Sequence, residues 1–510
     1  MYHKTVNFST IYERIYENGE KKMIEYISTR NSKEKVTAPQ AILNGQAPDG
    51  GLYVPENLDA LRLGDYRDVT SKDFKGMAKI IWSKFFPDYG EDVISDLVEK
   101  SYNGKFSSEK ITPLSVVDDD NFVLELYHGP TSAFKDVALS ALPNLMTKAR
   151  EIVGFKDEIL ILTATSGDTG SAALHGFKDV SGTRILVFYP NNGVSATQEL
   201  QMLGVGGNNT KACAINGNFD DAQSGVKKLF REIPKPRDGV SLSSANSINI
   251  GRLVPQVVYY FSAYKQMVEA GAIKDGEKLN FTVPTGNFGD ILAGYFAMKM
   301  GLPVNKLICA SNKNDVLTEF LQTGHYDRKR DFYKTNSPSM DILISSNLER
   351  LLYYVCGEEN TVKYMKELAE TGEYQISASE LAEIQYVFVG IAADDDEGSE
   401  AITSVFNKYH YLMDTHTSIA WSCCDKYKAS GDKMANVVLS TASPYKFCPA
   451  VLKALGETCE SSDKENMLKL QEKTGTEIPD NLSNLFDTKV QERTVIEISE
   501  MRDFLISELC

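Results

Sequence analysis

From about residue 121 onwards, short apolar runs alternate with longer helix-like segments along the chain. Apolar runs of strand length between helices are typical of strands that helices cover on both faces. The pattern therefore predicts an α/β fold with mostly parallel sheets flanked by helices. In such folds ligands bind beyond the carboxyl ends of the strands, so those loops are the first places to search for chemistry. The predicted strands are residues 122–126, 159–163, 185–189, 212–215, 279–283, 307–310 and 437–439.

The chain before residue 121 has a different pattern, which predicts a small N-terminal domain over residues 23–110. An extended run at 25–30, a helix at 38–44 and a turn into a strand at 48–55 precede a segment with helical periodicity over 71–101. The buried face of that last segment is predicted to consist of Ile80, Ile81, Trp82, Phe85 and Phe86.

The remaining boundaries are predicted from changes of pattern and composition. We expect a catalytic region over 111–455 that holds two α/β subdomains, followed by a C-terminal segment over 456–510. Residues 313–356 are charged and aromatic and resemble an insertion. Residues 1–22 are interpreted as an N-terminal extension, in which a Thr-x-x-Glu pattern at 10–13 fits a capping box that opens a short helix.

The charge balance bears on the partners of the protein. Lysine and arginine total 54 against 70 aspartate and glutamate residues, which gives a formal net charge of −16. A surface of this charge repels polyanions, and no block of basic residues with interleaved aromatics is present, so we expect no nucleic-acid partner. A ligand that carries phosphate therefore needs cations and helix-start amides arranged locally.

The cysteine, histidine and apolar residues argue against metal-binding, disulfide-bonded, secreted and membrane-spanning proteins. The eight cysteines form no CxxC pair or disulfide framework and the six histidines form no HExxH, so we expect no metal site and reduced thiols. The first 22 residues contain no apolar segment of a signal peptide, and no later apolar run approaches the roughly 18 residues of a membrane span. We therefore expect a cytoplasmic protein without a membrane partner.

Lys135 lies in the sequence HGPTSAFKD at residues 128–136, which follows the predicted strand 122–126 and opens a helix. A lysine at a helix N-terminus is unfavourable to the helix dipole. Small and apolar neighbours would lower its pKa, as a Schiff-base lysine requires. The alternative is a surface lysine whose stem packs on the protein while its amine reaches solvent.

Three further loops follow predicted strands. Residues 163–171, TATSGDTGS, combine hydroxyl groups with amides at a helix start, which favours a carboxylate or phosphate ligand. Residues 284–290, PTGNFGD, place glycines where a backbone can approach a phosphate, but lack the GxxxxGK[ST] and GxGxxG patterns of nucleotide sites. Residues 440–444, STASP, end the predicted strand 437–439. Helix capping or an ordinary turn is an alternative explanation of such loops taken singly.

Together these loops resemble the threonine synthase family, in its long-chain branch. The lysine loop, TSGDTG, the run SANSINIGRL at 244–253 and GNFGD occur in the order and spacing of that family, as do YISTR at 26–30 and DGGLY at 49–53. The likeness spans residues 23–455. It implies fold type II of the pyridoxal-phosphate enzymes, which is tryptophan synthase β-like, and pyridoxal 5′-phosphate (PLP) as the cofactor.

The resemblance assigns a role to each candidate site residue. Lys135 would be the catalytic residue and would hold PLP as a Schiff base, while Thr441 would face the pyridine nitrogen. Asp168 would lie beside the 3′-oxygen of the cofactor, where relatives outside this branch carry an asparagine. The cofactor phosphate would be held by Gly286, Asn287, Phe288, Gly289 and Asp290. The anionic groups of the substrate would be bound by Thr165, Ser166 and Thr169, and its phosphate by Asn246, Ser247 and Arg252.

The implied activity is that of a PLP-dependent carbon–oxygen lyase. Such an enzyme converts O-phospho-L-homoserine and water to L-threonine and phosphate by β,γ-elimination and replacement, the last step of threonine biosynthesis, with Lys135 as anchor and as acid and base. The expected partner is this small-molecule substrate, and the chain would be a monomer or a homodimer. One alternative is a threonine or serine dehydratase on the same fold, which would not need Arg252. Another is a catalytically silent relative, against which Lys135, GNFGD and Thr441 argue.

Overall fold

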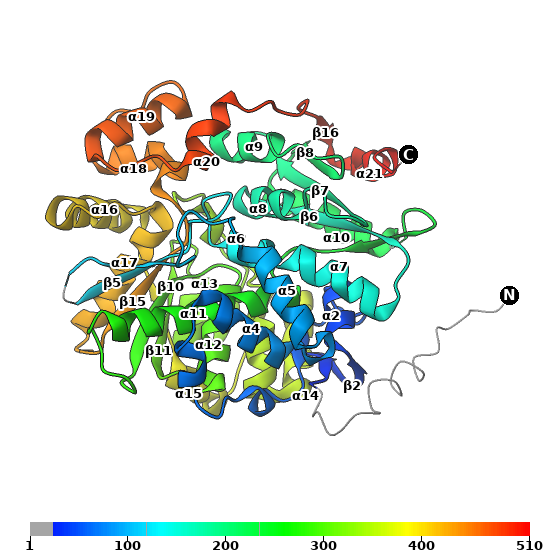
Figure 1. Ribbon diagram of the computed structural model, residues 1–510, viewed down its shortest axis with the longest axis horizontal. Helices are drawn as coiled ribbons and strands as arrows, with labels where there is room; N and C mark the ends of the chain where they lie inside the picture. Colours follow the sequence, from blue (N-terminus) through cyan, green and yellow to red (C-terminus); the bar gives the residue numbers. More distant parts are fainter. Residues whose placement is uncertain (1–23, 119, 234, 510) are drawn as a thin grey trace.

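Residues 24–118, 120–233 and 235–509 are described by a computed structural model of the chain (Figure 1). Two sheets dominate the fold, one of six strands and one of five. The five-stranded sheet lies in the upper half of Figure 1 and the six-stranded sheet in the lower half. The α/β architecture predicted from the apolar runs is thereby confirmed. The extension 1–22 and its predicted capping box lie outside the described residues.

The six-stranded sheet has the order β14-β11-β10-β15-β5-β4, and all its pairs are parallel except that of β4 with β5. Helices cover both of its faces: Val437 and Leu439 belong to the same core as α11 and α12, whereas Val438 belongs to the core of α16 and α17. Its strands are β4 (Leu114–Val116), β5 (Asn121–Glu125), β10 (Leu279–Pro284), β11 (Val304–Ser311), β14 (Phe388–Ala392) and β15 (Asn436–Ser440). The helices near it are α11 (Ile250–Glu269), α12 (Gly289–Met300), α13 (Val316–Thr323), α14 (Leu348–Glu370), α15 (Ala378–Val387), α16 (Asp395–Tyr409) and α17 (Thr415–Ala429).

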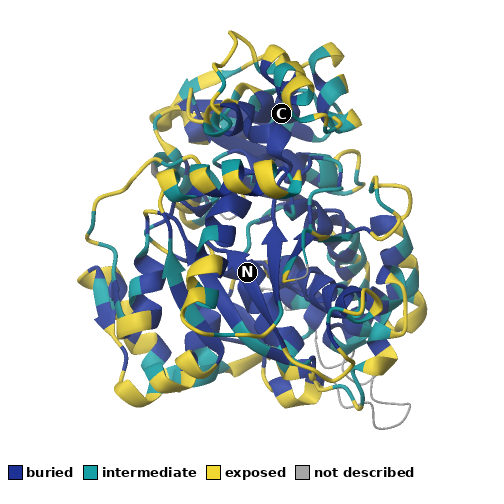
Figure 2. Cartoon of the chain, turned by 90° about the vertical axis from the view of Figure 1, so that its left-hand side faces the viewer, coloured by how far each residue is buried: buried dark blue, intermediate teal, exposed yellow. Residues whose placement is uncertain are grey.

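The five-stranded sheet is entirely parallel, with the order β16-β8-β7-β6-β9. Alternate side chains of β6 again belong to different cores, Ile159 and Ile161 to one and Leu160 and Leu162 to the other. The central strands β6, β7 and β8 are accordingly buried between helices whose outer faces are exposed (Figure 2), whereas the edge strand β16 is largely exposed. The elements are β6 (Glu158–Ala164), β7 (Thr183–Pro190), β8 (Thr210–Asn216), β9 (Val240–Ser243), β16 (Val495–Glu497), α6 (Lys135–Leu139), α7 (Leu142–Val153), α8 (Asp168–Phe177), α9 (Ala196–Leu203), α10 (Phe219–Glu232) and α21 (Met501–Ser507).

The N-terminal part forms a small antiparallel sheet of order β2-β1-β3 with helices packed on the same large core. The predicted helical segment 71–101 consists of two helices, because α4 ends at Phe85 and Pro87 opens a 3-10 turn before α5. Ile81, Trp82, Phe85 and Phe86 are fully buried, as predicted, whereas Ile80 is only partly buried. The elements are β1 (Tyr26–Ser28), β2 (Asn31–Val36), α2 (Ala38–Asn44), β3 (Tyr53–Pro55), η1 (Leu58–Leu61), α3 (Arg67–Thr70), α4 (Phe74–Phe85), η2 (Pro87–Tyr89) and α5 (Glu91–Tyr102).

The C-terminal part returns to the five-stranded sheet, where β16 pairs in parallel with β8. The apolar pattern did not predict β16, because three residues are too few to show a period. The boundaries at 23–110, 111–455 and 456–510, and the interpretation of 313–356 as an insertion, stay predictions. The remaining elements are β12 (His325–Asp327), η3 (Pro338–Met340), β13 (Glu373–Gln375), η4 (Pro444–Phe447), α18 (Cys448–Ala454), α19 (Asp463–Thr474), α20 (Asp480–Ser483), η5 (Asn484–Asp487) and η6 (Ile498–Glu500).

Helices α6 and α8 approach each other closely at Gly176, which gives a test of the packing. A Cβ there would lie 2.1 Å from the carbonyl oxygen of Leu139. We expect Gly176→Ala to lower the free energy of unfolding by about 1–3 kcal/mol, although alanine normally favours a helix, because the two backbones must separate. Urea unfolding measures this change. Gly64→Ala is the matched control, since a Cβ at Gly64 meets nothing within 4 Å; equal effects of the two substitutions would contradict the packing.

Candidate active site

A cavity of about 930 Å³ opens where β6, β10 and β15 end, and residues from both large sheets line it. Its volume suits a ligand of cofactor size together with a small substrate. All the predicted site residues line it except Asp168, which lies directly behind the wall, and Phe288. The structure therefore brings the four predicted loops to one place, at the strand ends where the α/β rule places ligands.

Lys135 begins α6 and is almost completely buried. Its Nζ lies 3.4 Å from Asp168 Oδ2 and 3.4 Å from the Ser339 hydroxyl oxygen, and 4.6 Å from the centre of the Phe134 ring. Burial lowers the pKa of Lys135 below its ordinary value, although the nearby Asp168 carboxylate acts in the opposite direction. This environment excludes the alternative of a solvated surface lysine.

The loop that carries Lys135 is held in shape by the buried carboxylate of Asp136. That carboxylate accepts hydrogen bonds from the Thr131 amide and hydroxyl, at 2.8 and 2.7 Å. A Cβ at Gly129 would lie 2.4 Å from Asp136 Cβ, so only glycine allows the loop to fold this tightly. The loop is also tied to the end of β15, because the Phe134 amide donates to the Thr441 carbonyl at 2.8 Å.

Asp168 opens α8, and its carboxylate contacts two amines. Oδ1 lies 2.7 Å from Lys446 Nζ and accepts a hydrogen bond from Gln198 Nε2 at 2.9 Å, while Oδ2 faces Lys135. Burial by itself would raise the pKa of Asp168, but the Lys446 and Lys135 amines outweigh it and hold that pKa far below its usual range. Asp168 is therefore a carboxylate throughout the physiological pH range.

The hydroxyl loop at residues 163–171, between β6 and α8, both hydrogen-bonds its own backbone and borders the cavity. Thr165 Oγ1 accepts the Gly167 and Gly170 amides, both at 2.9 Å, so its oxygen caps the turn. Ser166 and Thr169 line the cavity with Thr165. All three predicted residues therefore border the space available to a ligand, and Thr165 also shapes the loop.

The glycine loop joins β10 to α12 and presents backbone to the cavity. A Cβ at Gly286 would lie 2.7 Å from the Ser339 carbonyl oxygen, so a side chain would force the two loops apart. Phe288 adopts a left-handed conformation with φ of 62°, and its ring packs against Phe388 in the core. Phe288 therefore contributes its backbone, but not its side chain, to this part of the site. The start of α12 at Gly289 lies at the cavity wall, where helix N-terminal amides stabilise an anion.

The carboxylate of Asp290, in the first turn of α12, is directed towards α11. Its Oδ1 accepts hydrogen bonds from the hydroxyl groups of Tyr259 and Tyr260, and its Oδ2 is buried without a hydrogen-bond partner in the described part of the chain. Burial raises the pKa of Asp290 to about 6. Asp290 therefore anchors the helix start on α11 while it borders the cavity.

Arg252, in the first turn of α11, is a buried cation that borders the cavity. Its Nη1 donates to the Ala245 carbonyl at 2.9 Å, and none of the carboxylates described forms an ion pair with it. Burial lowers its pKa to about 10, which leaves it charged at neutral pH. Beside it, Asn246 Oδ1 is buried without a hydrogen-bond partner, and Ser247 Oγ lies 3.3 Å from Ser346 Oγ.

Several cavity residues were not found from the sequence. Ser339 belongs to the 313–356 segment, and its amide donates to His416 Nε2 at 3.1 Å. The other ring nitrogen of His416 lies 2.7 Å from the buried Asp414 carboxylate, so the dyad fixes the segment against Lys135. No local signal could have identified this contact, because the partners are far apart in sequence. Lys446, which lies behind the cavity wall against Asp168, is the second residue after the predicted STASP turn and lacked a pattern of its own.

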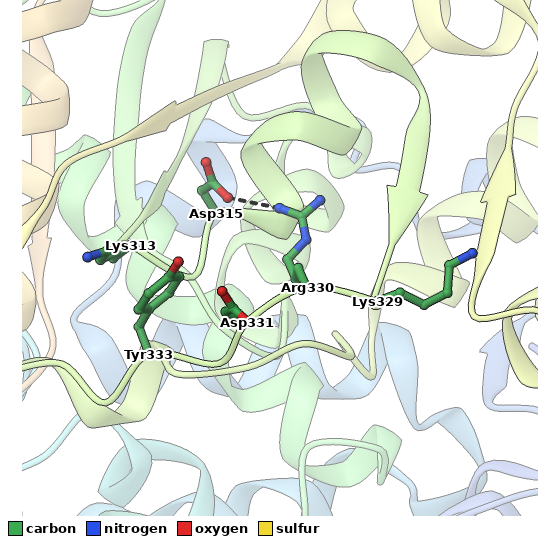
Figure 3. A pocket seen from close by; sticks show the side chains of 6 residues that line it. All are labelled: Lys313, Asp315, Lys329, Arg330, Asp331 and Tyr333. Atoms are coloured by element: carbon green, nitrogen blue, oxygen red, sulfur yellow. Dashed lines mark hydrogen bonds and ion pairs between the residues drawn. The ribbon is translucent and has the colours of Figure 1, made fainter.

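A second hollow, of about 680 Å³, lies at the surface around Arg330 (Figure 3). Its charges are largely satisfied internally, since Arg330 pairs with Asp315 at 2.9 Å and Lys313 lies 4.3 Å from the centre of the Tyr333 ring. It contains no part of the four loops. The larger cavity is therefore the candidate active site.

The described residues contain neither a metal-binding cluster nor a helix that could span a membrane. There, no group of three or more histidine, cysteine, aspartate or glutamate side chains is arranged to hold a metal ion. Among the helices formed by the same residues, none combines the length and the apolar character needed to cross a membrane.

Comparison with known proteins gives matches along most of the chain. Residues 25–102 match the family model for the threonine synthase N terminus, 112–387 that for pyridoxal-phosphate dependent enzymes, and 417–504 that for the threonine synthase C-terminal region. Threonine synthase of Saccharomyces cerevisiae is 37% identical over 477 residues, which cover 87% of this chain and 91% of the yeast protein. Human threonine synthase-like 1 is 37% identical over 455 residues, and the chain spans 60% of its length.

Solved structures agree with these matches. The PLP-bound threonine synthase from Brucella melitensis superimposes with a TM-score of 0.80 at 36% identity, covering 95% of this chain and 99% of that chain. The yeast threonine synthase superimposes with a TM-score of 0.83 at 34% identity, covering 95% and 98%. The chain therefore belongs to the threonine synthase family of pyridoxal-phosphate dependent enzymes.

Proposed function

We propose that the protein uses PLP to convert O-phospho-L-homoserine and water to L-threonine and phosphate. The observation that carries this proposal is the buried Arg252, which has no carboxylate partner among the described residues and borders the same cavity as the buried Lys135. A buried cation without a counter-ion is costly, so an anionic group of the ligand is its natural partner. The yeast relative, which matches most of this chain, carries the name threonine synthase.

The residues that border the cavity fit PLP. Lys135 would hold the cofactor through Nζ, and the helix start at 286–290 would bind its phosphate with backbone amides. Thr441 would face the ring nitrogen and Asp168 the 3′-oxygen. When bound, PLP supplies an electron sink that allows protons to leave carbon atoms near the amine of an amino acid. A neutral hydroxyl at Thr441 does not enforce a proton on the ring nitrogen, which suits elimination and replacement chemistry.

The substrate is assigned to the other walls of the cavity. Arg252 would bind its phosphate, together with the side chains of Asn246 and Ser247, and the unpartnered Asn246 Oδ1 supports a polar ligand there. Its carboxylate would lie among the hydroxyl groups of Thr165, Ser166 and Thr169.

Proton transfer is assigned to Lys135, because its buried amine borders the cavity beside these groups. Its lowered pKa provides the uncharged form that a base needs. Lys135 would remove protons from the substrate Cα and Cβ, return one at Cγ once phosphate has left, and return one at Cα after water has added at Cβ. Burial of the cavity walls limits access of water to the site, apart from the water that adds at Cβ.

The rival reactions differ in their products. A dehydratase would release ammonia and a 2-oxo acid from threonine or serine, whereas the proposed enzyme releases inorganic phosphate from O-phospho-L-homoserine. A catalytically silent relative would do neither. Measuring phosphate release with threonine formation decides among the three, and the absence of both products from cofactor-loaded protein would refute the proposal.

The location and the assembly of the protein are proposals of the same kind. A cytoplasmic location is supported by the seven described cysteines, all of which are free thiols. Cell fractionation tests it. We propose that the chain acts as a monomer or a homodimer with a small-molecule substrate, and sedimentation equilibrium distinguishes the two forms.

Lys135→Ala is expected to abolish turnover while the fold remains, because it removes both the anchor of the cofactor and the proton carrier. The substitution also relieves the burial of an amine, so the melting temperature should not fall sharply. Steady-state phosphate release and thermal unfolding measure the two effects. Lys100→Ala, which removes an exposed amine paired with Asp96, is the control and should leave turnover unchanged. Threonine production by Lys135→Ala at the wild-type rate would refute the assignment of Lys135 as the catalytic residue.

Arg252→Lys is expected to be severe although it keeps the charge, because a planar guanidinium can bind two phosphate oxygens at once. We expect kcat/KM for O-phospho-L-homoserine to fall roughly 30- to 1,000-fold, which corresponds to about 2–4 kcal/mol. The visible absorption of bound PLP should persist. The control is Arg502→Lys, at an exposed arginine. Unchanged kinetics, or a loss fully matched by unfolding, would show that Arg252 is structural.

A further inference from the structure

Lys446, Asp168 and Lys135 form a charged cluster with one carboxylate and two amines. Lys446 belongs to η4, and its side chain is completely buried, as are those of Asp168 and Lys135 apart from a few per cent. The Lys446 amine lies 2.7 Å from Asp168 Oδ1 and donates to the Thr131 carbonyl at 2.9 Å. The proposed reaction gives Lys446 no part, yet it is buried against the site.

The distances within the cluster are unequal. Asp168 Oδ1 is engaged at short range by Lys446 and by Gln198. Asp168 Oδ2 lies at 3.4 Å from both Lys135 and the Ser339 hydroxyl, near the upper limit of a hydrogen bond. The single negative charge of Asp168 is therefore matched by Lys446, and Lys135 is left without a carboxylate of its own.

The other charged or titratable groups near Lys135 do not change this balance. Arg252 on α11 acts on it as a second positive charge, and Asp290 on α12 is bound to the tyrosines of α11. His416 on α17 accepts the Ser339 amide at Nε2, and its other ring nitrogen lies 2.7 Å from Asp414 Oδ2, so both ring nitrogens are engaged by groups other than Lys135. Burial lowers the pKa of Lys135, Asp168 raises it, and Arg252 and Lys446 lower it further.

We propose that Lys446 is a positioning residue that neutralises Asp168 and thereby keeps Lys135 in the uncharged form. An uncharged amine is the form that can attack a carbonyl carbon and accept a proton. Lys446 also explains how a carboxylate is tolerated at position 168. Because the Lys446 amine contacts Asp168 Oδ1, the pair presents no net negative charge to the cavity. The need for an uncharged Lys135 rests on the proposed function. The charge state of the Lys135 amine, however, can be measured independently of that function.

The test uses the full-length chain freed of cofactor, without substrate. Brief acetylation with acetic anhydride over a range of pH, followed by mass spectrometry of the peptide that contains Lys135, gives the pH at which this amine is half reactive. In Lys446→Met, Asp168 loses its ion pair and turns to Lys135, so the midpoint should rise by about 1–3 pH units. In Asp168→Asn the attraction disappears and the midpoint should fall. The double variant Asp168→Asn/Lys446→Met should lie between the two single variants.

Controls separate this role from a merely structural one. Lys100→Met removes an exposed lysine and should leave the midpoint unchanged. Near-ultraviolet circular dichroism and thermal unfolding establish that each variant is folded. A folded Lys446→Met protein with the wild-type midpoint overturns the proposal, whatever its melting temperature. If Lys446→Met does not fold, Asp168→Asn decides, and an unchanged or raised midpoint overturns the proposal in that case.

Failure of this inference is distinguishable from failure of the proposed function. The midpoints depend on charge alone, because neither cofactor nor substrate is present in the labelling. Phosphate release from O-phospho-L-homoserine by the cofactor-loaded wild type depends on the proposed reaction. Shifted midpoints without phosphate release would refute the function and keep the role of Lys446, whereas phosphate release with unshifted midpoints would do the reverse.

Discussion

The candidate active site depends on the contacts that the buried carboxylate of Asp168 makes with two lysine amines. The carboxylate lies between these amines, Lys446 at 2.7 Å and Lys135 at 3.4 Å, and all three groups are removed from water. Charges in such an environment are costly unless they are paired and hydrogen-bonded. The pair formed by Asp168 and Lys446 satisfies that requirement and leaves Lys135 as the amine at the cavity. In the proposed function, the reactive amine is therefore the one of the two lysines that lacks a close carboxylate partner.

This interaction also connects the two large sheets. The loop of Lys135 is bound to the end of β15, through the bridge between Ala133 and Ala442 and through the Ser443 amide, which donates to the Ser132 carbonyl at 3.1 Å. Asp168 instead follows β6 of the five-stranded sheet. The contact between the two residues therefore spans the sheets, and a small displacement of one sheet relative to the other would alter the charge balance of the site.

The cavity reconciles an acidic protein with the anionic substrate proposed for it. The chain carries a formal net charge of −16, yet the buried Arg252 and the start of α12 bring positive charge and backbone amides to one cavity. Because these groups are buried, salt screens them much less than it screens the acidic surface. The local arrangement of charge, rather than the net charge, would account for the proposed binding of phosphate groups.

The sequence by itself determined seven strands of the two large sheets, the four loops and the position of Lys135, because apolar periodicity and turn chemistry are local properties. Seven predicted strands agree with the structure to within a few residues, from 122–126 to 437–439. Only the tertiary structure decided which side chains meet. Lys446 reaches Asp168, and Ser339 reaches Lys135, across more than 200 residues of chain. Phe288 turns into the core although its loop borders the cavity. The physical reason is that these contacts depend on how the sheets pack, which no short stretch of sequence encodes.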